Sequence, residues 1–169
     1  MSQSADQHRA EAPSSVRCAV VTVSDSRTLE TDTGGLAVVE RLRQGKHEVV
    51  DRQIVPDEPE RIRELLAAYR DRDDVDAILI TGGTGISRRD RTFDVVNEML
   101  TTPLPGYGEL FRMLSYEQVG AAAMLSRATG GLMDRKVLLT MPGSPAAVHL
   151  AMGKIILKEL AHLVREARR

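Results

Sequence analysis

The chain has no tryptophan, a single cysteine and no long apolar segment, and its charges almost cancel. Aromatic residues are only 3% of the sequence, which argues against the stacking platforms that bind single-stranded nucleic acid. The 23 Lys and Arg and 24 Asp and Glu give a net charge of −1, so there is no overall attraction for a phosphate backbone. We therefore expect no nucleic-acid partner.

The cysteine and histidine content argues against two kinds of stabilising site. One cysteine excludes an intramolecular disulfide and a cysteine-based zinc site. Cys18 lies within an apolar strand pattern, and we expect it to be buried and inert. The four histidines lack the spacing of metal ligands and are interpreted as surface or packing residues: His8, His47, His149 and His162.

No apolar run approaches the roughly 20 residues that a membrane span requires, so we expect no membrane partner. Residues 1–14 are polar and lack the apolar core of a signal peptide. We interpret them as a disordered tail on a cytoplasmic protein. The remaining residues, 15–169, are enough for a single domain with its own hydrophobic core.

Short apolar runs alternate with helical patterns along this domain. The apolar runs predict strands over residues 17–23, 49–55, 77–80 and 137–141. Apolar residues at helical spacing predict helices over about 34–45, around 62–69, over 93–100, over 109–125, and from about 145 toward the end of the chain. Residues 103–108, rich in proline and glycine, are interpreted as a loop.

This alternation predicts a three-layer α/β fold of the Rossmann type. Right-handed crossovers would give a mainly parallel, twisted sheet with helices on both faces. Such sheets bind ligands beyond the carboxyl ends of their strands, at a topological switch point. Polar or glycine-rich segments follow four predicted strands directly, at residues 24–25, 56–57, 81–85 and 142–145. We therefore expect these segments to share one edge of the sheet.

The segment Gly82-Gly83-Thr84-Gly85 is the sharpest local signal for ligand binding. Glycines allow positive φ and close approach, so successive backbone amides can point at one anion. A helix amino terminus just beyond the loop would add positive potential, and each charge-assisted hydrogen bond would contribute roughly 1.5–3 kcal/mol. The alternative is a tight structural turn. The segment is neither a Walker A loop nor a G-x-G-x-x-G fingerprint, which disfavours a nicotinamide dehydrogenase.

Two aspartates are the main candidates for chemistry at this edge. Asp57 begins the segment after the second strand, and Asp90 follows the glycine loop. Each could instead cap the helix that comes next. Two carboxylates beside a polyphosphate would hold Mg²⁺, which prefers oxygen ligands. The neighbouring Arg88, Arg89 and Arg91 could neutralise phosphate charge or be simply solvated.

The turn Pro142-Gly143-Ser144-Pro145 combines a sharp bend with a hydroxyl group at a predicted helix start. Ser144 could cap that helix, bind a ribose or phosphate oxygen, or do both. The G-x-S-x-G pattern is absent and no histidine is placed as a base, so a serine nucleophile is not expected.

Together these residues resemble the molybdenum cofactor biosynthesis family that includes MogA, MoaB and the amino-terminal domain of gephyrin, and are most similar to its MoaB branch. The resemblance runs from about Cys18 to Leu163. It is carried by residues 22–27, 32–35, 55–57, 81–85, 90–92, 105–112, 125–127 and 142–145. It implies a molybdopterin-binding fold and transfer of AMP from Mg·ATP to the terminal phosphate of molybdopterin, with release of pyrophosphate.

The resemblance also implies roles for individual residues. Asp57 and Asp90 would be the essential aspartates, with Mg²⁺ between them and the nucleotide. Nucleotide or phosphate binding is expected of Thr81, Gly82, Gly83, Thr84, Gly85, Gly143 and Ser144. Substrate binding is expected of Ser24, Asp25, Ser26, Arg27, Ser126 and Arg127.

The expected partners are molybdopterin, a nucleotide, further copies of the chain in a trimer or hexamer, and the metal-insertion protein of the pathway. The run Ala121–Leu125 could pack on a partner or in the core. The main alternative function is a non-catalytic protein that holds a pterin or nucleotide. A nicotinamide or flavin oxidoreductase would lack its fingerprint.

Overall fold

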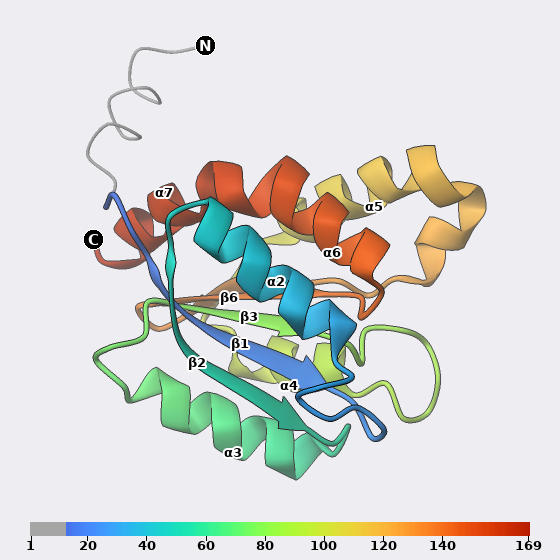
Figure 1. The fold of residues 1–169 in the computed structure, drawn as a ribbon, viewed down its shortest axis with the longest axis horizontal. Coiled ribbons are helices and arrows are strands. Elements are labelled where there is room, and N and C mark those ends of the chain that lie inside the picture. The colour runs from blue at the N-terminus through green and yellow to red at the C-terminus, as the bar shows by residue number, and fades with distance from the viewer. Residues whose placement is uncertain (1–12) are drawn as a thin grey trace.

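The computed structural model describes residues 13–169, which form a six-stranded sheet with helices on both faces (Figure 1). The strands are β1 (Arg17–Val23), β2 (Glu48–Val55), β3 (Ala77–Thr81), β4 (Thr102–Pro103), β5 (Gly130–Met133) and β6 (Lys136–Met141). Their order is β2-β1-β3-β6-β5-β4: the first four run parallel, β5 runs antiparallel to β6, and β4 runs antiparallel to β5. The predicted α/β class is confirmed. Most of the expected tail, residues 1–12, lies outside the described residues.

The helices divide between the two faces of the sheet (Figure 1). One face carries α2 (Thr33–Gln44), α5 (Pro105–Val119), α6 (Pro145–Ala151) and α7 (Leu157–Ala167), and the other carries α3 (Pro59–Arg70) and α4 (Thr92–Met99). A 3-10 helix, η1 (Gly120–Leu125), follows α5, and a π-helical turn, η2 (Met152–Ile156), joins α6 to α7. Within residues 13–169, no helix has the length and apolar character needed to cross a membrane.

The three central strands are buried on both sides, which explains their unbroken apolar sequences. In β1, Cys18 and Val20 belong to the core under α2, whereas Ala19 and Val21 belong to the core over α3. Each fully buried Val or Leu side chain stabilises the fold by about 1.5–3 kcal/mol. Cys18 is fully buried, as predicted, and burial raises the pKa of its thiol.

The interpretation of residues 103–108 as a loop is wrong. Pro103 ends β4 and Pro105 opens α5, at the first helical position, where a missing N–H costs no hydrogen bond. Gly108 lies within α5, and its position requires glycine because a Cβ there would be only 2.5 Å from the Ala128 carbonyl oxygen. The sequence did not predict β5. A Cβ on Gly131 would be 2.2 Å from the Thr102 oxygen, so close packing against β4 requires glycine at this position. Glycine is uncommon in strands, so the sequence of β5 gives little indication of a strand.

The long helix predicted after residue 145 is interrupted by η2. Three members of its predicted apolar stripe are buried, namely Val148, Met152 and Leu160. Ile156, the last residue of the π turn, and Val164 in α7 are buried in place of the predicted Ile155 and Leu163, which are only partly buried. The wider turn shifts the helical register by about one residue.

Candidate functional site

The carboxyl ends of the four parallel strands lie level with one another. Thr22 pairs with Thr81, and Thr81 pairs with Met141. The segments that follow are joined directly: the Gly82 amide donates to the Met141 oxygen at 3.0 Å, and the Thr81 hydroxyl donates to the Pro142 oxygen at 3.1 Å. The expectation that the polar segments share one edge is confirmed. Because β2 and β3 lie on opposite sides of β1, this edge contains a topological switch point.

The glycine loop is built from backbone that other residues cannot adopt without strain. Gly82 has φ of 98° and Gly83 has φ of 62°. A Cβ on Gly82 would lie 2.3 Å from the Val23 oxygen, so the loop packs directly on the end of β1. The expected helix amino terminus beyond the loop is present: α4 begins at Thr92, after the turn of residues 86–91, and the Thr92 amide donates to the Gly83 oxygen at 3.2 Å.

Asp57 is buried against this loop, with a side-chain oxygen next to Gly83. A Cβ on Gly83 would lie 2.7 Å from Asp57 Oδ2, and the other oxygen, Oδ1, accepts the Arg91 amide at 2.9 Å. Burial raises the pKa of Asp57, and the negative charges of Asp90 and Asp25 raise it further. The hydrogen bond from the Arg91 amide lowers the pKa, but the net shift is upward. Asp57 does not cap α3, whose cap position is Glu58 and has no side-chain capping bond.

Asp90 lies on the other side of the loop. A Cβ on Gly85 would be 2.8 Å from Asp90 Oδ2, which accepts the Ser87 amide at 2.8 Å. Asp90 therefore closes the 87–90 turn. It is not the cap of α4, a position held by Arg91 without a side-chain bond. For both aspartates the capping alternative is wrong, and both carboxylates face the glycine loop.

This donor set fits a magnesium ion that arrives with a phosphate ligand. Among residues 13–169, no three His, Cys, Asp or Glu side chains are grouped to hold a metal alone. Mg²⁺ commonly uses one or two protein carboxylates, with water and substrate phosphates completing its octahedron. The unfavourable proximity of Asp57 to Asp90 is what a bound cation would relieve.

Asp25 ties three of the edge segments together. Its Oδ1 accepts the Asp57 amide at 3.0 Å, and its carboxylate forms a two-pronged ion pair with Arg89 at 2.7–3.0 Å. The hydrogen bonds from Arg89, which have the largest effect, and the bond from the Asp57 amide lower the pKa of Asp25. Asp25 and Arg89 are thus engaged with each other, whereas Arg91 pairs with Asp94.

The other residues expected to bind substrate lie in two places. Ser24, Asp25 and Arg27 line an open hollow of about 610 Å³ beside the end of β2, and Ser26 is exposed next to it. Ser24 Oγ accepts the Ser26 and Arg27 amides and shapes this loop. Ser126 and Arg127 follow η1 and lie next to Thr84 and Gly85 of the glycine loop.

Arg127 holds the 85–90 segment in place. Its guanidinium donates to the Gly85 oxygen at 2.7 Å and to the Asp90 oxygen, pairs with Asp94 at 3.2 Å, and lies 5.0 Å from the Phe93 ring centre. Its amide also donates to the Thr84 oxygen at 2.8 Å. The side chain therefore positions the loop between Asp57 and Asp90.

A mainly apolar pocket of about 290 Å³ opens beside the loop. It is lined by Thr84, Gly85, Ser126 and Ser144, and by apolar side chains that include Phe111 and Leu150. Ser144 caps α6, because its hydroxyl accepts the Ala147 amide at 3.3 Å, so that alternative is confirmed. The pocket has the size and character to hold a flat ring next to the polar loop.

Two supporting features were not predicted from the sequence. Buried Asp32 caps α2 through the Gly35 amide and accepts bonds from Thr22 and Arg52 at 2.7 and 2.9 Å. Burial acts to raise the pKa of Asp32, but these bonds outweigh it and the net shift is downward. Thr92 is fully buried beside Gly83, and its hydroxyl has no hydrogen-bond partner in the described part of the chain. The only indication of Thr92 in the sequence is that it belongs to residues 90–92, one of the segments that carry the family resemblance.

The chain is similar to proteins of molybdenum cofactor biosynthesis. Residues 19–162 match the family described as "Probable molybdopterin binding domain". The chain is 49% identical over 164 residues to molybdenum cofactor biosynthesis protein B of Halalkalibacterium halodurans, covering 96% of each chain. A crystal structure of a molybdenum cofactor biosynthesis protein B superposes with a TM-score of 0.90 at 48% identity, over 94% of this chain and 99% of that one. The tungsten cofactor synthesizing protein MoaB of Pyrococcus furiosus has a TM-score of 0.80 at 36% identity, over 94% and 100%.

Proposed function

Because the chain belongs to the molybdopterin-binding family of molybdenum cofactor biosynthesis proteins, we propose that it is a molybdopterin adenylyltransferase. It transfers AMP from Mg·ATP to the terminal phosphate of molybdopterin and releases pyrophosphate. The observation that carries this proposal is the glycine loop held between the carboxylates of Asp57 and Asp90. A phosphate placed on this loop would meet the half-buried backbone of Gly83 and Gly85 and a cation site at the same point.

The reaction needs little covalent help from the protein. The phosphate of molybdopterin attacks the α-phosphorus of ATP, and the bond from that phosphorus to the departing pyrophosphate breaks. The loop 82–85 would orient the phosphates, and Asp57 and Asp90 would hold Mg²⁺, which would supply charge neutralisation. Positioning and charge stabilisation of this kind provide most of the rate enhancement in phosphoryl-type transfers. Asp25, Arg89 and Arg127 keep the two carboxylates in place.

The apolar pocket beside the loop completes the site. Its wall of Phe111 and Leu150 would stack on or enclose a ring, while Ser126 and Ser144 at the polar end offer hydroxyl groups to it. A non-catalytic pterin- or nucleotide-binding protein is the second candidate, and the apolar pocket alone would serve it equally well. Intact carboxylates on both sides of the glycine loop favour the enzyme.

The test is a turnover assay with purified protein, molybdopterin, Mg²⁺ and either ATP or GTP, followed by pyrophosphate release and detection of the adenylylated pterin. We expect product with ATP, and no product when Mg²⁺ is removed by EDTA and restored turnover when it is returned. Binding of molybdopterin without turnover under any of these conditions would contradict the enzyme and support the carrier.

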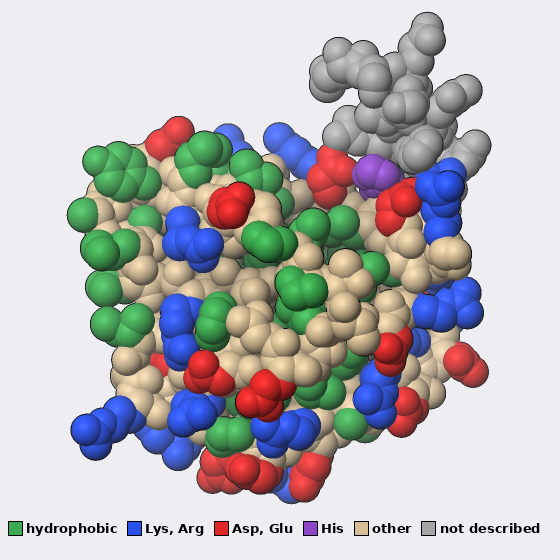
Figure 2. All heavy atoms as spheres, turned by 180° about the vertical axis from the view of Figure 1, so that it is seen from behind, with side chains coloured by type: hydrophobic (Ala, Val, Ile, Leu, Met, Phe, Trp, Pro, Cys, Tyr) green, Lys and Arg blue, Asp and Glu red, His purple; other side chains and the backbone are tan. Residues whose placement is uncertain are grey.

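We also propose that the chain forms a trimer or hexamer through the edge made by α5 and η1. Exposed hydrophobic side chains gather there, along the left edge of Figure 2. They are Leu110, Met113, Tyr116, Val119, Met124 and Leu125, exposed by 47–78%. Of the run 121–125 only Ala123 is buried, so this run is largely available to a partner.

Light scattering should therefore give the mass of a trimer or hexamer at micromolar concentration. The double change Met113→Glu and Val119→Glu should lower that mass, because it places charge on an apolar contact. Leu29→Glu, at a side chain exposed by 56% on a different loop, is the matched control and should leave the mass unchanged. A monomeric wild-type mass would refute the proposal.

A further inference from the structure

A second hollow lies on the face of the sheet covered by α2, α5, α6 and α7, next to the apolar pocket of the proposed active site. Its volume is about 460 Å³, and it is formed where α2 packs beside α6 and the η2 turn (Figure 1). Four basic side chains line it, namely Arg41, His149, Lys154 and Lys158, and among residues 13–169 no carboxylate does. The remaining lining is Gln118 and the small or apolar Ala146, Leu150 and Gly153.

Three of these side chains, Arg41, Lys154 and Lys158, are cationic at neutral pH, and within residues 13–169 none of them forms an ion pair, unlike several other basic side chains on the surface. Arg61, Arg63 and Arg70, for example, form ion pairs with neighbouring carboxylates on the surface. Within residues 13–169, neither Lys154 nor Lys158 makes an ion pair, and Arg41 donates only to His149 Nδ1 at 3.2 Å and to Gln44 at 3.4 Å. In a chain of net charge −1, the hollow is thus a local excess of positive charge.

The backbone under the hollow is also irregular. The π turn Met152–Ile156 makes hydrogen bonds between residues five apart, which brings His149 and Lys154 toward the same side of the helix. Gly153, whose Cβ position has no neighbouring atom within 4 Å, leaves the floor open between them. The bond from Arg41 requires an unprotonated Nδ1 on His149, so Nε2 is the donor nitrogen of the neutral ring.

We propose that this hollow docks an acidic segment of a partner protein. The basic side chains are mostly exposed, and each ion pair at such a position contributes only about 0–1 kcal/mol. The lining residues lie within helices, whose backbone amides are already bonded, so a single small phosphate would find no fixed cradle. A peptide with several carboxylates engages several cations at once, and its aliphatic groups fit the floor of Ala146, Leu150 and Gly153.

The position of the hollow gives the docking a consequence. Gln118, Ala146 and Leu150 line both this hollow and the apolar pocket beside the glycine loop. A partner seated on the basic side chains therefore lies next to the mouth of the pocket in which the proposed chemistry occurs. This arrangement suits a protein that takes over a product as it leaves.

The test measures binding of a fluorescein-labelled oligoglutamate peptide by fluorescence anisotropy at low salt. We expect saturable binding to the wild type and a loss of about tenfold or more in affinity for the double variant Lys154→Glu with Lys158→Glu. The matched control is Arg135→Glu, an exposed arginine in the turn between β5 and β6, which carries a charge change of the same sign and should alter affinity by no more than about twofold.

Three results would overturn the docking proposal. They are the absence of peptide binding, an equal loss of affinity in the double variant and the Arg135 control, and displacement of the peptide by inorganic pyrophosphate at concentrations where KCl of equal ionic strength has no effect. The last would assign the hollow to a small phosphate anion. Lys154 and Lys158 lie outside the proposed catalytic site, so the turnover assay decides the enzymatic proposal separately.

Discussion

Asp57→Asn and Asp90→Asn proteins should remain folded and adenylylate molybdopterin at least ~10²-fold more slowly than the wild type. Asparagine keeps an oxygen that can accept the Arg91 or Ser87 amide, so the loop geometry is retained. The lost charge removes the ligand that would hold Mg²⁺ against the phosphates. The measurement is the rate of pyrophosphate release at saturating Mg·ATP, with thermal unfolding run on the same samples.

Stability and activity should move independently in the Asp57 variant. The pKa of Asp57 is raised in the fold, first by burial, so its ionised form is disfavoured by folding at neutral pH. Removing that charge should leave stability unchanged or increase it while turnover falls. Asp71→Asn, at an exposed carboxylate just beyond α3, is the control and should change neither quantity. Wild-type rates in folded Asp57 and Asp90 variants would refute their catalytic assignment.

Much of the fold followed from local sequence because its central strands are buried on both faces. β1, β3 and β6 are continuous apolar runs bounded by polar or glycine-rich turns, a pattern that predicts buried strands. The missing pieces depended on contacts distant in sequence. β4 has two residues, and β5 contains glycines whose presence is explained by the backbone of neighbouring strands. Local patterns carry no information about such close approaches.

The site was predictable in position but not in its internal connections. The rule that ligands bind at the carboxyl edge placed Asp57, the glycine loop and Ser144 correctly relative to the sheet. It could not show that Asp25 accepts bonds from both the Asp57 amide and Arg89, because these residues are joined only by the folded loops. The pairing of Arg127 with the Gly85 carbonyl was hidden for the same reason.

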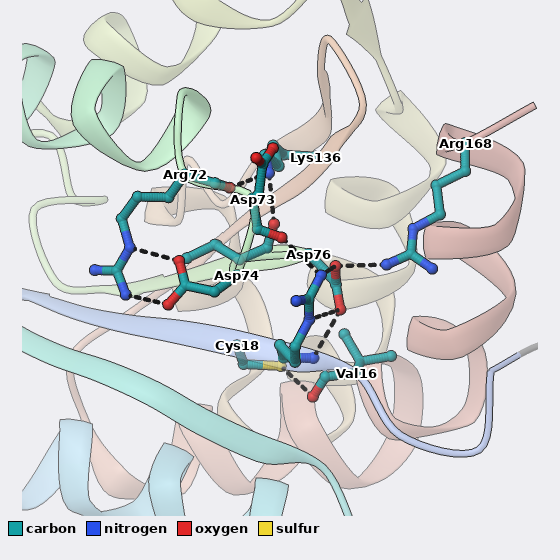
Figure 3. Close-up of polar contacts among 10 residues, drawn as sticks. Val16, Cys18, Arg72, Asp73, Asp74, Asp76, Lys136 and Arg168 are labelled. Carbon is teal, nitrogen blue, oxygen red and sulfur yellow. Dashed lines mark hydrogen bonds and ion pairs between the residues drawn. The ribbon is translucent and has the colours of Figure 1, made fainter.

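Asp76→Asn should destabilise the protein by about 2 kcal/mol at pH 7 and lower its melting temperature by roughly 4–8 °C. Asp76 precedes β3 and is 6% exposed. Its carboxylate accepts hydrogen bonds from the side chain of Arg17, the first residue of β1. It also accepts one from Arg168, after α7, as Figure 3 shows. The Arg17 amide donates to it at 3.0 Å. One side chain therefore holds two strands and the end of the chain together, at the edge opposite the proposed site.

The exposed neighbour Asp74 provides the control for this loss. It pairs with Arg72 at 2.7 Å, but its side chain is 55% exposed, so Asp74→Asn should cost less than about 0.5 kcal/mol. Chemical denaturation monitored by circular dichroism would measure both variants. Equal denaturation midpoints would contradict the assignment of Asp76 as a buried charge that stabilises the fold.

The pH dependence of the stability difference between wild type and Asp76→Asn distinguishes an effect of the Asp76 charge from an effect of side-chain packing. Burial acts to raise the pKa of Asp76, but the bonds from Arg17 and Arg168 outweigh it and lower the pKa to about 2 from an ordinary value of 3.8. A depressed pKa means that the stabilisation is complete above the unfolded value and disappears as pH falls toward the folded one. The difference between wild type and Asp76→Asn should therefore shrink between about pH 4 and pH 2. A difference that persisted unchanged to about pH 2 would assign the loss to altered packing and refute an electrostatic origin.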